Sequence, residues 1–193
     1  MSLAPWRSLI TRALHKNRSL VYSRYLQLAT VRENGLPANR TVVFRGFVED
    51  TNQLKFITDI RSAKAEQISK QTAAEICWYF PNTREQFRIA GQLILITANS
   101  YPHLQAARMK MWQELSDAAR LQFAWPDPGE MRVRTPEAFT PPAPDNIEPV
   151  ENFCLLLLEP TEVDHLELRG EPQNRTFYQI DENQSWYYQE INP

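Results

Sequence analysis

Four basic side chains and one hydroxyl lie close together in the sequence between positions 40 and 64. They are Arg40, Arg45, Arg61, Ser62 and Lys64. Guanidinium and ammonium groups make charge-assisted hydrogen bonds to phosphate, and the start of a helix offers free backbone N–H groups to the same anion. Ser62 is a suitable N-cap for a helix that begins at the next residue. This group predicts a phosphate pocket, and solvated surface cations are the alternative that the spacing alone leaves open.

Two short strands and one helix would position these side chains. Residues 40–45 are β-branched and aromatic, which favours a strand, and residues 54–58 form a second strand after turn residues at 50–52. The helix is expected over 63–70. Its first turn would then face the neighbouring strand that carries Arg40.

The rest of the chain is expected to be mainly strands. They are predicted over 25–32, 38–49, 74–80, 85–98, 153–168, from Phe177 or Tyr178 onward, and over 185–191. Asn34-Gly35 is a hairpin signal, and Gly91 in the middle of a long strand indicates a bulge or a close approach of two backbones. A meander with one helix between its strands predicts a closed or half-closed antiparallel barrel.

Helices are expected only at the periphery of this barrel. They are predicted over 5–16, 102–115 and 117–124. The proline-rich stretch 126–149 is long for a segment without structure of its own, so it is either a partly mobile lid or a segment that packs across a partner subunit. We therefore expect one mainly β domain over 1–193, a β-barrel with peripheral helices.

Composition excludes several classes of protein. A net charge of −2 and a pI near 6 argue against a protein that binds nucleic acid or a membrane surface. The N-terminus has no apolar signal core, so a soluble, cytoplasmic protein is expected. Cys77 and Cys154 lie in apolar runs and are interpreted as reduced core thiols, with a disulfide left open. The three histidines have no metal-binding spacing, so no metal site is predicted.

Three motifs together resemble a known family. They are R-x-V-V-x-R at 40–45, F-x-T-D-x-R-S-x-K at 56–64, and F-P followed by E-Q-F-R-I-x-G at 80–91. This pattern is similar to the flavin mononucleotide (FMN) binding core of the pyridoxamine 5′-phosphate oxidase family. The similarity continues at 175–178 and in the C-terminal strand. It runs from about Tyr25 to the end, with a poor match in the middle helical region.

The resemblance implies an FMN-binding split β-barrel, antiparallel and homodimeric, with one FMN per subunit at the dimer interface. Arg40 and Lys64 would bind the flavin phosphate with help from Ser62, and Arg61 would add charge beside them. The remaining cofactor-binding residues that the resemblance implies are Thr41, Val42, Val43, Arg45, Ile57, Thr58, Gln86 and Arg175. Cations near the ring would stabilise reduced flavin. Arg88 would share a strand face with Gln86.

The sequence also departs from the oxidase pattern. Ala63 replaces an arginine of the phosphate motif. Glu171, Pro172 and Gln173 replace the Arg-x-His pair that holds the phosphate of the vitamin B6 substrate. His165 stands in place of a flavin-covering tryptophan, and we interpret it as an exposed or packing histidine.

The resemblance and these departures together indicate an FMN-dependent oxidoreductase whose grip on the B6 phosphate is missing, with an unknown small-molecule substrate and unknown catalytic residues. The alternatives are a non-catalytic FMN carrier or sensor, and a split barrel that uses another flavin-like cofactor.

Overall fold

The computed structural model describes residues 3–193. The order of its elements along the chain is α1 (Pro5–Lys16), β1 (Tyr25–Val31), β2 (Pro37–Val43), β3 (Leu54–Asp59), α2 (Ala63–Lys70), β4 (Ala73–Phe80), β5 (Glu85–Ile96), α3 (Pro102–Gln113), α4 (Asp117–Leu121), the 3-10 turns Gln122–Ala124 and Pro136–Phe139, β6 (Phe153–Glu167), β7 (Asn174–Ile180) and β8 (Trp186–Ile191). No helix in the described range has the length and apolar character needed to cross a bilayer.

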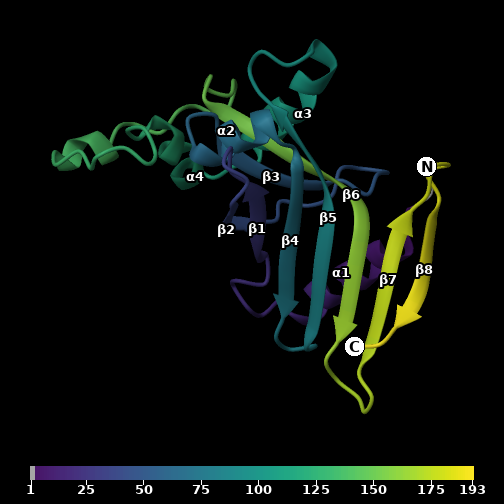
Figure 1. The fold of residues 1–193 in the computed structure, drawn as a ribbon. Helices are drawn as coiled ribbons and strands as arrows, with labels where there is room; N and C mark the ends of the chain where they lie inside the picture. Colours follow the sequence, from purple (N-terminus) through teal and green to yellow (C-terminus); the bar gives the residue numbers. More distant parts are fainter. Residues whose placement is uncertain (1–2) are drawn as a thin grey trace.

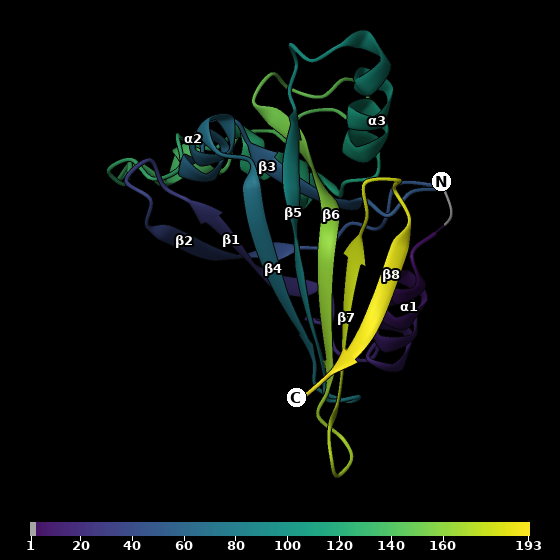
Figure 2. The same cartoon turned by 45° about the vertical axis from the view of Figure 1, so that its right-hand side comes forward.

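The strands form one antiparallel sheet that divides along β6. Its order is β2-β1-β4-β5-β6-β7-β8, and β3 pairs with the first part of β6 (Figure 1). On the edge of β6 away from β5, pairing with β3 ends at Leu158 and pairing with β7 begins at Glu162. The β7–β8 hairpin therefore leaves the barrel as a separate wing, which lies beside α1 in Figure 2.

The barrel closes where the chain leaves β2. In this connection Arg45 N donates to Lys55 O and Gly46 O accepts from Lys55 N, each at 2.8 Å, and Phe47 bridges to Leu54 at the start of β3. The predicted strand 38–49 is therefore wrong beyond Val43. Gly46 has a φ of +114°, a left-handed conformation that turns the chain toward β3 and that residues with a Cβ rarely adopt. The closed or half-closed barrel predicted from the meander is confirmed.

The predicted close approach at Gly91 is confirmed. The register between β5 and β6 shifts at Ala90/Gly91. A Cβ built on Gly91 would lie 2.0 Å from the carbonyl oxygen of Glu159, so any side chain would force the two strands apart. Glycine is needed here because two backbones meet at the point where β6 changes partners.

The main core lies between the sheet and α1. Trp6, Ile10 and Ala13 of α1 are fully buried, as the predicted apolar stripe requires. The rings of Trp6 and Trp186 meet edge to face with centroids 5.4 Å apart, so α1 joins the barrel to the β7–β8 wing. A second cluster around Trp112 and Phe153 packs α3 against the first part of β6.

Residues 125–140, which we call the arm, project from the end of the sheet that carries α2 and α4 (Figure 1). The arm contains one 3-10 turn, Pro136–Phe139. Two buried donors hold the chain that follows it. Trp112 Nε1 donates to Asp145 O at 2.9 Å, and Arg120 Nε donates to Pro144 O at 3.1 Å. The proline-rich segment is thus tied at its far end to α3 and α4.

Candidate functional site

An ammonium and two hydroxyls converge at the start of α2. Ser62 caps the helix by accepting a hydrogen bond from Ala65 N, as predicted. Lys64 Nζ donates to Thr58 Oγ1 and lies 3.4 Å from Ser62 Oγ, and the two hydroxyl oxygens are 3.2 Å apart. Three groups that can donate to one anion therefore meet at the positive end of a helix.

Arg40 supplies the second positive charge of this site. It is half-buried on β2, where Nη1 donates to Thr30 Oγ1 at 2.7 Å and Nη2 donates to Gln67 Oε1 at 2.9 Å. Burial lowers the pKa of Lys64 to about 8, and the charge of Arg40 adds to the effect. Two like charges held this close favour an anion between them.

Two of the predicted phosphate ligands differ from Lys64 in their surroundings. Arg61 Nη2 pairs with Asp59 Oδ2 at 2.6 Å, and Arg61 Nη1 pairs with Asp127 Oδ1 at 2.6 Å. Arg45 has a buried Nε without a hydrogen-bond partner among the described residues, and its charged neighbours include Arg24. Arg61 therefore lines the same pocket as Ser62 and Lys64 but has its charge already paired, and the expectation that Arg45 joins this site stays a prediction.

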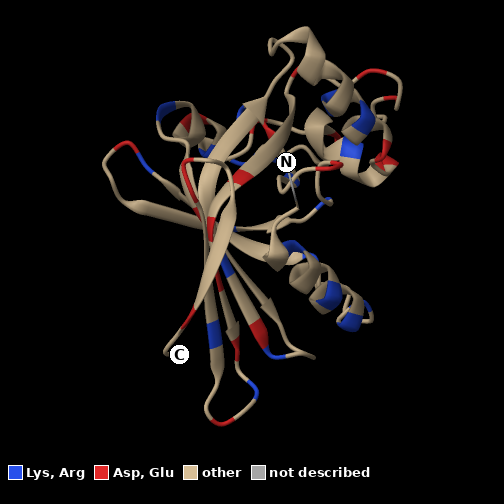
Figure 3. Cartoon of the chain, turned by 90° about the vertical axis from the view of Figure 1, so that its right-hand side faces the viewer, with Lys and Arg blue, Asp and Glu red and all other residues tan. Residues whose placement is uncertain are grey.

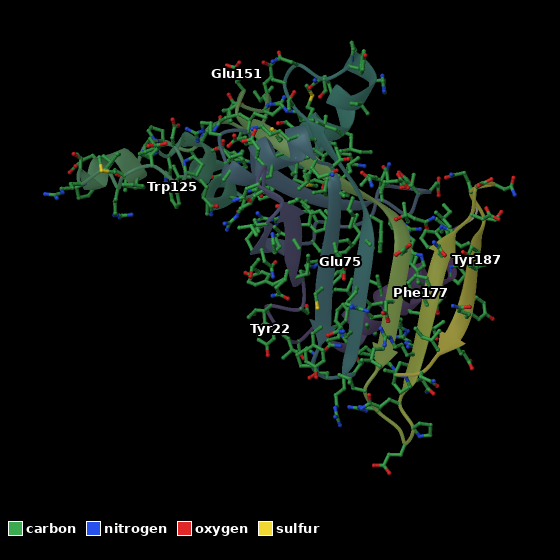
Figure 4. The ribbon with its side chains drawn as sticks, viewed as in Figure 1. Tyr22, Glu75, Trp125, Glu151, Phe177 and Tyr187 are labelled. Atoms are coloured by element: carbon green, nitrogen blue, oxygen red, sulfur yellow. The ribbon has the colours of Figure 1, made fainter. Side chains whose placement is uncertain are left out.

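A pocket of about 680 Å³ opens beside Lys64. Its lining includes five residues of the predicted cofactor set, Ile57, Thr58, Arg61, Ser62 and Lys64. The arm and the residues just before it form the opposite wall, with the side chains Phe123, Trp125, Met131, Val133 and Phe139. Trp125 is labelled on the arm in Figure 4. The pocket thus joins an anion-binding end to an apolar and aromatic wall.

The other predicted residues lie on the outer face of the sheet. Gln86 and Arg88 alternate with the buried Phe87 on β5, so they share one face as predicted. Asp164 on β6 accepts hydrogen bonds from Arg88 and from Arg175 Nη2, the latter at 2.7 Å. Burial opposes ionisation of Asp164, but hydrogen bonds from Arg175 and Arg88 outweigh it and lower its pKa. Figure 3 shows basic and acidic residues interspersed along these strands.

One chain does not bring this outer-face group to the phosphate end. Arg40 lies opposite Leu28, on the face that packs into the core, whereas Thr41 and Val43 point outward and Val42 is buried. Strand β2 is separated from β5 by β1 and β4, three strand spacings or roughly 14 Å. Gln86 and Arg175 therefore lie on the opposite face of the sheet from Arg40, and Gln86 is three strands away from it.

His165 packs in the interior, as the packing interpretation predicted. Its ring stacks on Phe87 with centroids 4.2 Å apart, and its Nε2 lies 3.2 Å from Glu85 Oε1. Arg12 of α1 also donates to Glu85, at 2.8 Å. Glu167 completes a group whose ligand atoms lie within 4.8 Å, but Arg12 Nη2 is 3.8 Å from its carboxylate and already supplies the positive charge. No spacing in the sequence identifies this cluster, because its members come from α1, β5 and β6.

Acid should weaken this cluster through Glu85. Burial opposes ionisation, but hydrogen bonds from His165, Thr83 and Arg12 outweigh it and lower the pKa of Glu85 from 4.5 to about 2. A depressed pKa stabilises the fold above pH 4.5, and this contribution is lost as the pH falls toward 2. We expect Glu85→Gln to lower the free energy of unfolding by about 3 kcal/mol at pH 7 and by progressively less below pH 4.5. Urea denaturation at several pH values measures this. Glu167→Gln is the control, and a pH-independent difference for Glu85→Gln would contradict the assignment.

Comparison with known proteins supports the resemblance seen in the sequence. Residues 3–97 match the family described as pyridoxamine 5′-phosphate oxidase, FMN-binding domain. The chain is 37% identical over 196 residues to pyridoxine/pyridoxamine 5′-phosphate oxidase 2 of Arabidopsis thaliana, a match that covers 99% of this chain and 98% of that protein.

Solved structures agree with this assignment. A pyridoxamine 5′-phosphate oxidase-related, FMN-binding protein of Nostoc punctiforme is 68% identical and superposes with a TM-score of 0.98 over 100% of both chains. PhzG of Burkholderia lata superposes with a TM-score of 0.77 at 20% identity, over 97% of this chain and 92% of that one, which shows a shared fold alone. The predicted mainly antiparallel split barrel is confirmed, and the family's cofactor is the predicted FMN. The chain belongs to the pyridoxamine 5′-phosphate oxidase family of FMN-binding split barrels.

Proposed function

We propose that this protein binds FMN with its phosphate at the start of α2. The observation that carries the proposal is the pair of cations Arg40 and Lys64 beside the hydroxyls of Thr58 and Ser62. Within residues 3–193, neither cation has a carboxylate as a hydrogen-bond partner, although Asp59 lies near enough to influence Lys64. A phosphate dianion would neutralise both charges and accept hydrogen bonds from all four side chains.

The flavin ring is proposed to lie between two copies of the chain. Gln86 and Arg175 are expected ring contacts, but they lie on the outer face and three or more strands away from β2. A second copy packed on that face would bring its own Gln86 and Arg175 to the ring bound by the first. The arm is a further candidate for the interface, as its length suggested.

We propose oxidation–reduction of a small molecule as the reaction, with the flavin carrying the electrons and the protein supplying binding and electrostatics. The name of the Arabidopsis relative describes an oxidase of pyridoxine and pyridoxamine 5′-phosphates. In this chain the β6–β7 hairpin carries Glu171, Pro172 and Gln173, and Glu171 would repel a substrate phosphate. The proposed substrate therefore lacks that phosphate.

A non-catalytic FMN carrier or sensor is the second candidate. It is favoured by the same hairpin, because the basic pair that would hold a phosphorylated substrate is absent while the cofactor end is retained. The two candidates differ in one respect. An enzyme returns electrons from reduced flavin to an acceptor repeatedly, whereas a carrier does not.

The test is the visible absorption spectrum of the purified protein. We expect the visible absorption of an oxidised flavin, and release of a chromophore with the mass of FMN on denaturation. Reduction followed by exposure to several electron acceptors then separates the candidates, since turnover supports the enzyme and a single reoxidation supports the carrier. A colourless protein that does not take up added FMN would refute both.

A further inference from the structure

Arg61 occupies a corner where three parts of the chain meet. Its guanidinium makes a bidentate pair with Asp59, from Nε at 2.9 Å and from Nη2 at 2.6 Å. The remaining nitrogen, Nη1, donates to Asp127 Oδ1 at 2.6 Å and to Trp125 O at 3.2 Å. One side chain thus connects the end of β3 and the start of α2 to the first residues of the arm.

Asp59 strengthens the same junction through a second donor. Asn152 Nδ2 donates to Asp59 Oδ2 at 2.9 Å and to Phe123 O at 2.8 Å. Arg61 Nη2 also lies 3.4 Å from Phe123 O. The backbone carbonyl of Phe123, just before the arm, is therefore held by two side chains that share one carboxylate. We call Asp59, Arg61, Asp127 and Asn152 the clamp.

The arm itself is held together mainly by its own residues. Trp125 Nε1 donates to Phe139 O at 2.9 Å, and the two rings meet edge to face at 6.0 Å. The guanidinium of Arg132 lies over the Phe139 ring at 4.7 Å. These contacts shape the arm but do not attach it to the barrel. Attachment at the Trp125 end comes from the clamp.

The clamp adjoins the proposed phosphate site. Asp59, Arg61, Ser62 and Lys64 belong to one short segment, and all four line the 680 Å³ pocket that the arm encloses from the other side. Arg61 faces two carboxylates, so its charge is already compensated before any phosphate arrives. Its position suits it to hold the wall of the pocket better than to attract an anion.

We propose that Arg61 is a positioning residue, which clamps the arm through Asp59 and Asp127 and so sets how long a ligand stays in the pocket beside Lys64. The identity of that ligand as FMN rests on the proposed function. The clamp itself does not, because its contacts exist within the chain alone. Closure by the clamp would slow dissociation, whereas association would depend on Arg40 and Lys64.

The two roles of Arg61 predict opposite effects for a change at Asp127. If Arg61 positions the arm, Asp127→Asn loosens the arm. We then expect the rate of FMN dissociation to rise about tenfold in Asp127→Asn and also in Arg61→Gln, with little change in the association rate. If Arg61 instead binds the phosphate, Asp127→Asn frees its guanidinium and FMN binds equally well or more tightly. Recovery of flavin fluorescence on release, measured by stopped flow, separates these outcomes.

Glu137→Gln is the matched control. It removes the same charge from the same arm, but Glu137 is exposed, lies outside the clamp and is not among the residues that line the pocket. We expect its dissociation rate to stay within about twofold of the wild type. An equal increase in Glu137→Gln and Asp127→Asn would show that charge alone is responsible and would overturn the proposal.

A second measurement tests the clamp without FMN. Arg132 and Arg134 are exposed on the arm, so trypsin should cut there faster when the arm is loosened. We expect Asp127→Asn to accelerate these cuts, identified by fragment mass, and Glu137→Gln to leave them unchanged. Faster cutting in a protein that binds no FMN would support the clamp while refuting the proposed function. Unchanged cutting in Asp127→Asn would overturn the clamp.

Discussion

Replacing both Arg40 and Lys64 by alanine is expected to weaken FMN binding by at least about a hundredfold while the sheet stays folded. Each side chain offers charge-assisted hydrogen bonds to the phosphate, and such bonds contribute about 1.5–3 kcal/mol each. The loss of two therefore corresponds to a factor of roughly 10² to 10⁴ in the dissociation constant. Fluorescence titration of the apoprotein with FMN measures the change.

The fold should survive because neither side chain belongs to the apolar core. Arg40 does contact Thr30 and Gln67, so its removal should lower the free energy of unfolding by about 1–2 kcal/mol. Far-ultraviolet circular dichroism and urea denaturation check that the variant is folded. The single variant Arg40→Lys, which keeps the charge but loses the paired donors, should fall between the wild type and the double variant.

A matched control separates local geometry from overall charge. The double variant Arg18→Ala, Lys70→Ala also removes one arginine and one lysine, and Lys70 lies on the same helix as Lys64. Both side chains lie at the surface, where Arg18 donates to the His15 carbonyl and Lys70 pairs with Glu33. We expect this control to bind FMN within about threefold of the wild type. If the Arg40 and Lys64 double variant also keeps near wild-type affinity, the phosphate lies elsewhere and the proposed site is wrong.

Local physics made part of this site predictable. The N-cap of Ser62, the helix of α2 and the strand of β3 depend on residues within a few positions of each other, and all three are confirmed. Gly91 was identifiable for a similar reason, because a glycine inside an apolar strand indicates a close backbone approach. The family motifs added the cofactor, which spacing alone did not identify.

The partners of Arg61 and His165 were not predictable in this way. Asp127 lies 66 positions after Arg61, and Glu85 lies 80 positions before His165, so no spacing rule relates the members of either pair. A cation beside a helix start attracts an anion whether that anion is a ligand or a carboxylate from a distant loop. The sequence indicates that a cation near a helix start will bind an anion, and the fold determines which anion lies beside it.

The same distinction explains why Lys64 and Arg61 differ although three positions separate them. Arg61 has two carboxylates at 2.6 Å, and the hydrogen bonds that it donates to Asp59 raise its pKa despite some burial. Among residues 3–193, Lys64 Nζ donates hydrogen bonds only to hydroxyls, so burial and the charge of Arg40 lower the pKa of Lys64 to about 8. Of the two cations, Lys64 is the one whose charge lacks compensation, and a bound phosphate would supply it.

This depressed pKa leads to a pH dependence of FMN binding. Only the protonated ammonium attracts the phosphate dianion, and in the apoprotein it loses its proton near pH 8. Bound phosphate favours the charged form and raises the pKa of Lys64, so binding takes up a proton above pH 8. We expect the dissociation constant for FMN to be nearly constant from pH 7 to 7.5 and to rise by up to tenfold per pH unit between about pH 8 and 10.

Fluorescence titration at constant ionic strength from pH 7 to 10 measures this slope, and two variants show whether it belongs to Lys64. Lys64→Arg keeps a charge that does not titrate in this range, so its affinity should change little with pH. Lys64→Met should bind weakly at every pH and also show little dependence, because the titrating group is gone. A slope that persists in both variants would assign the proton to another group and would remove the main electrostatic reason for placing the phosphate beside Lys64.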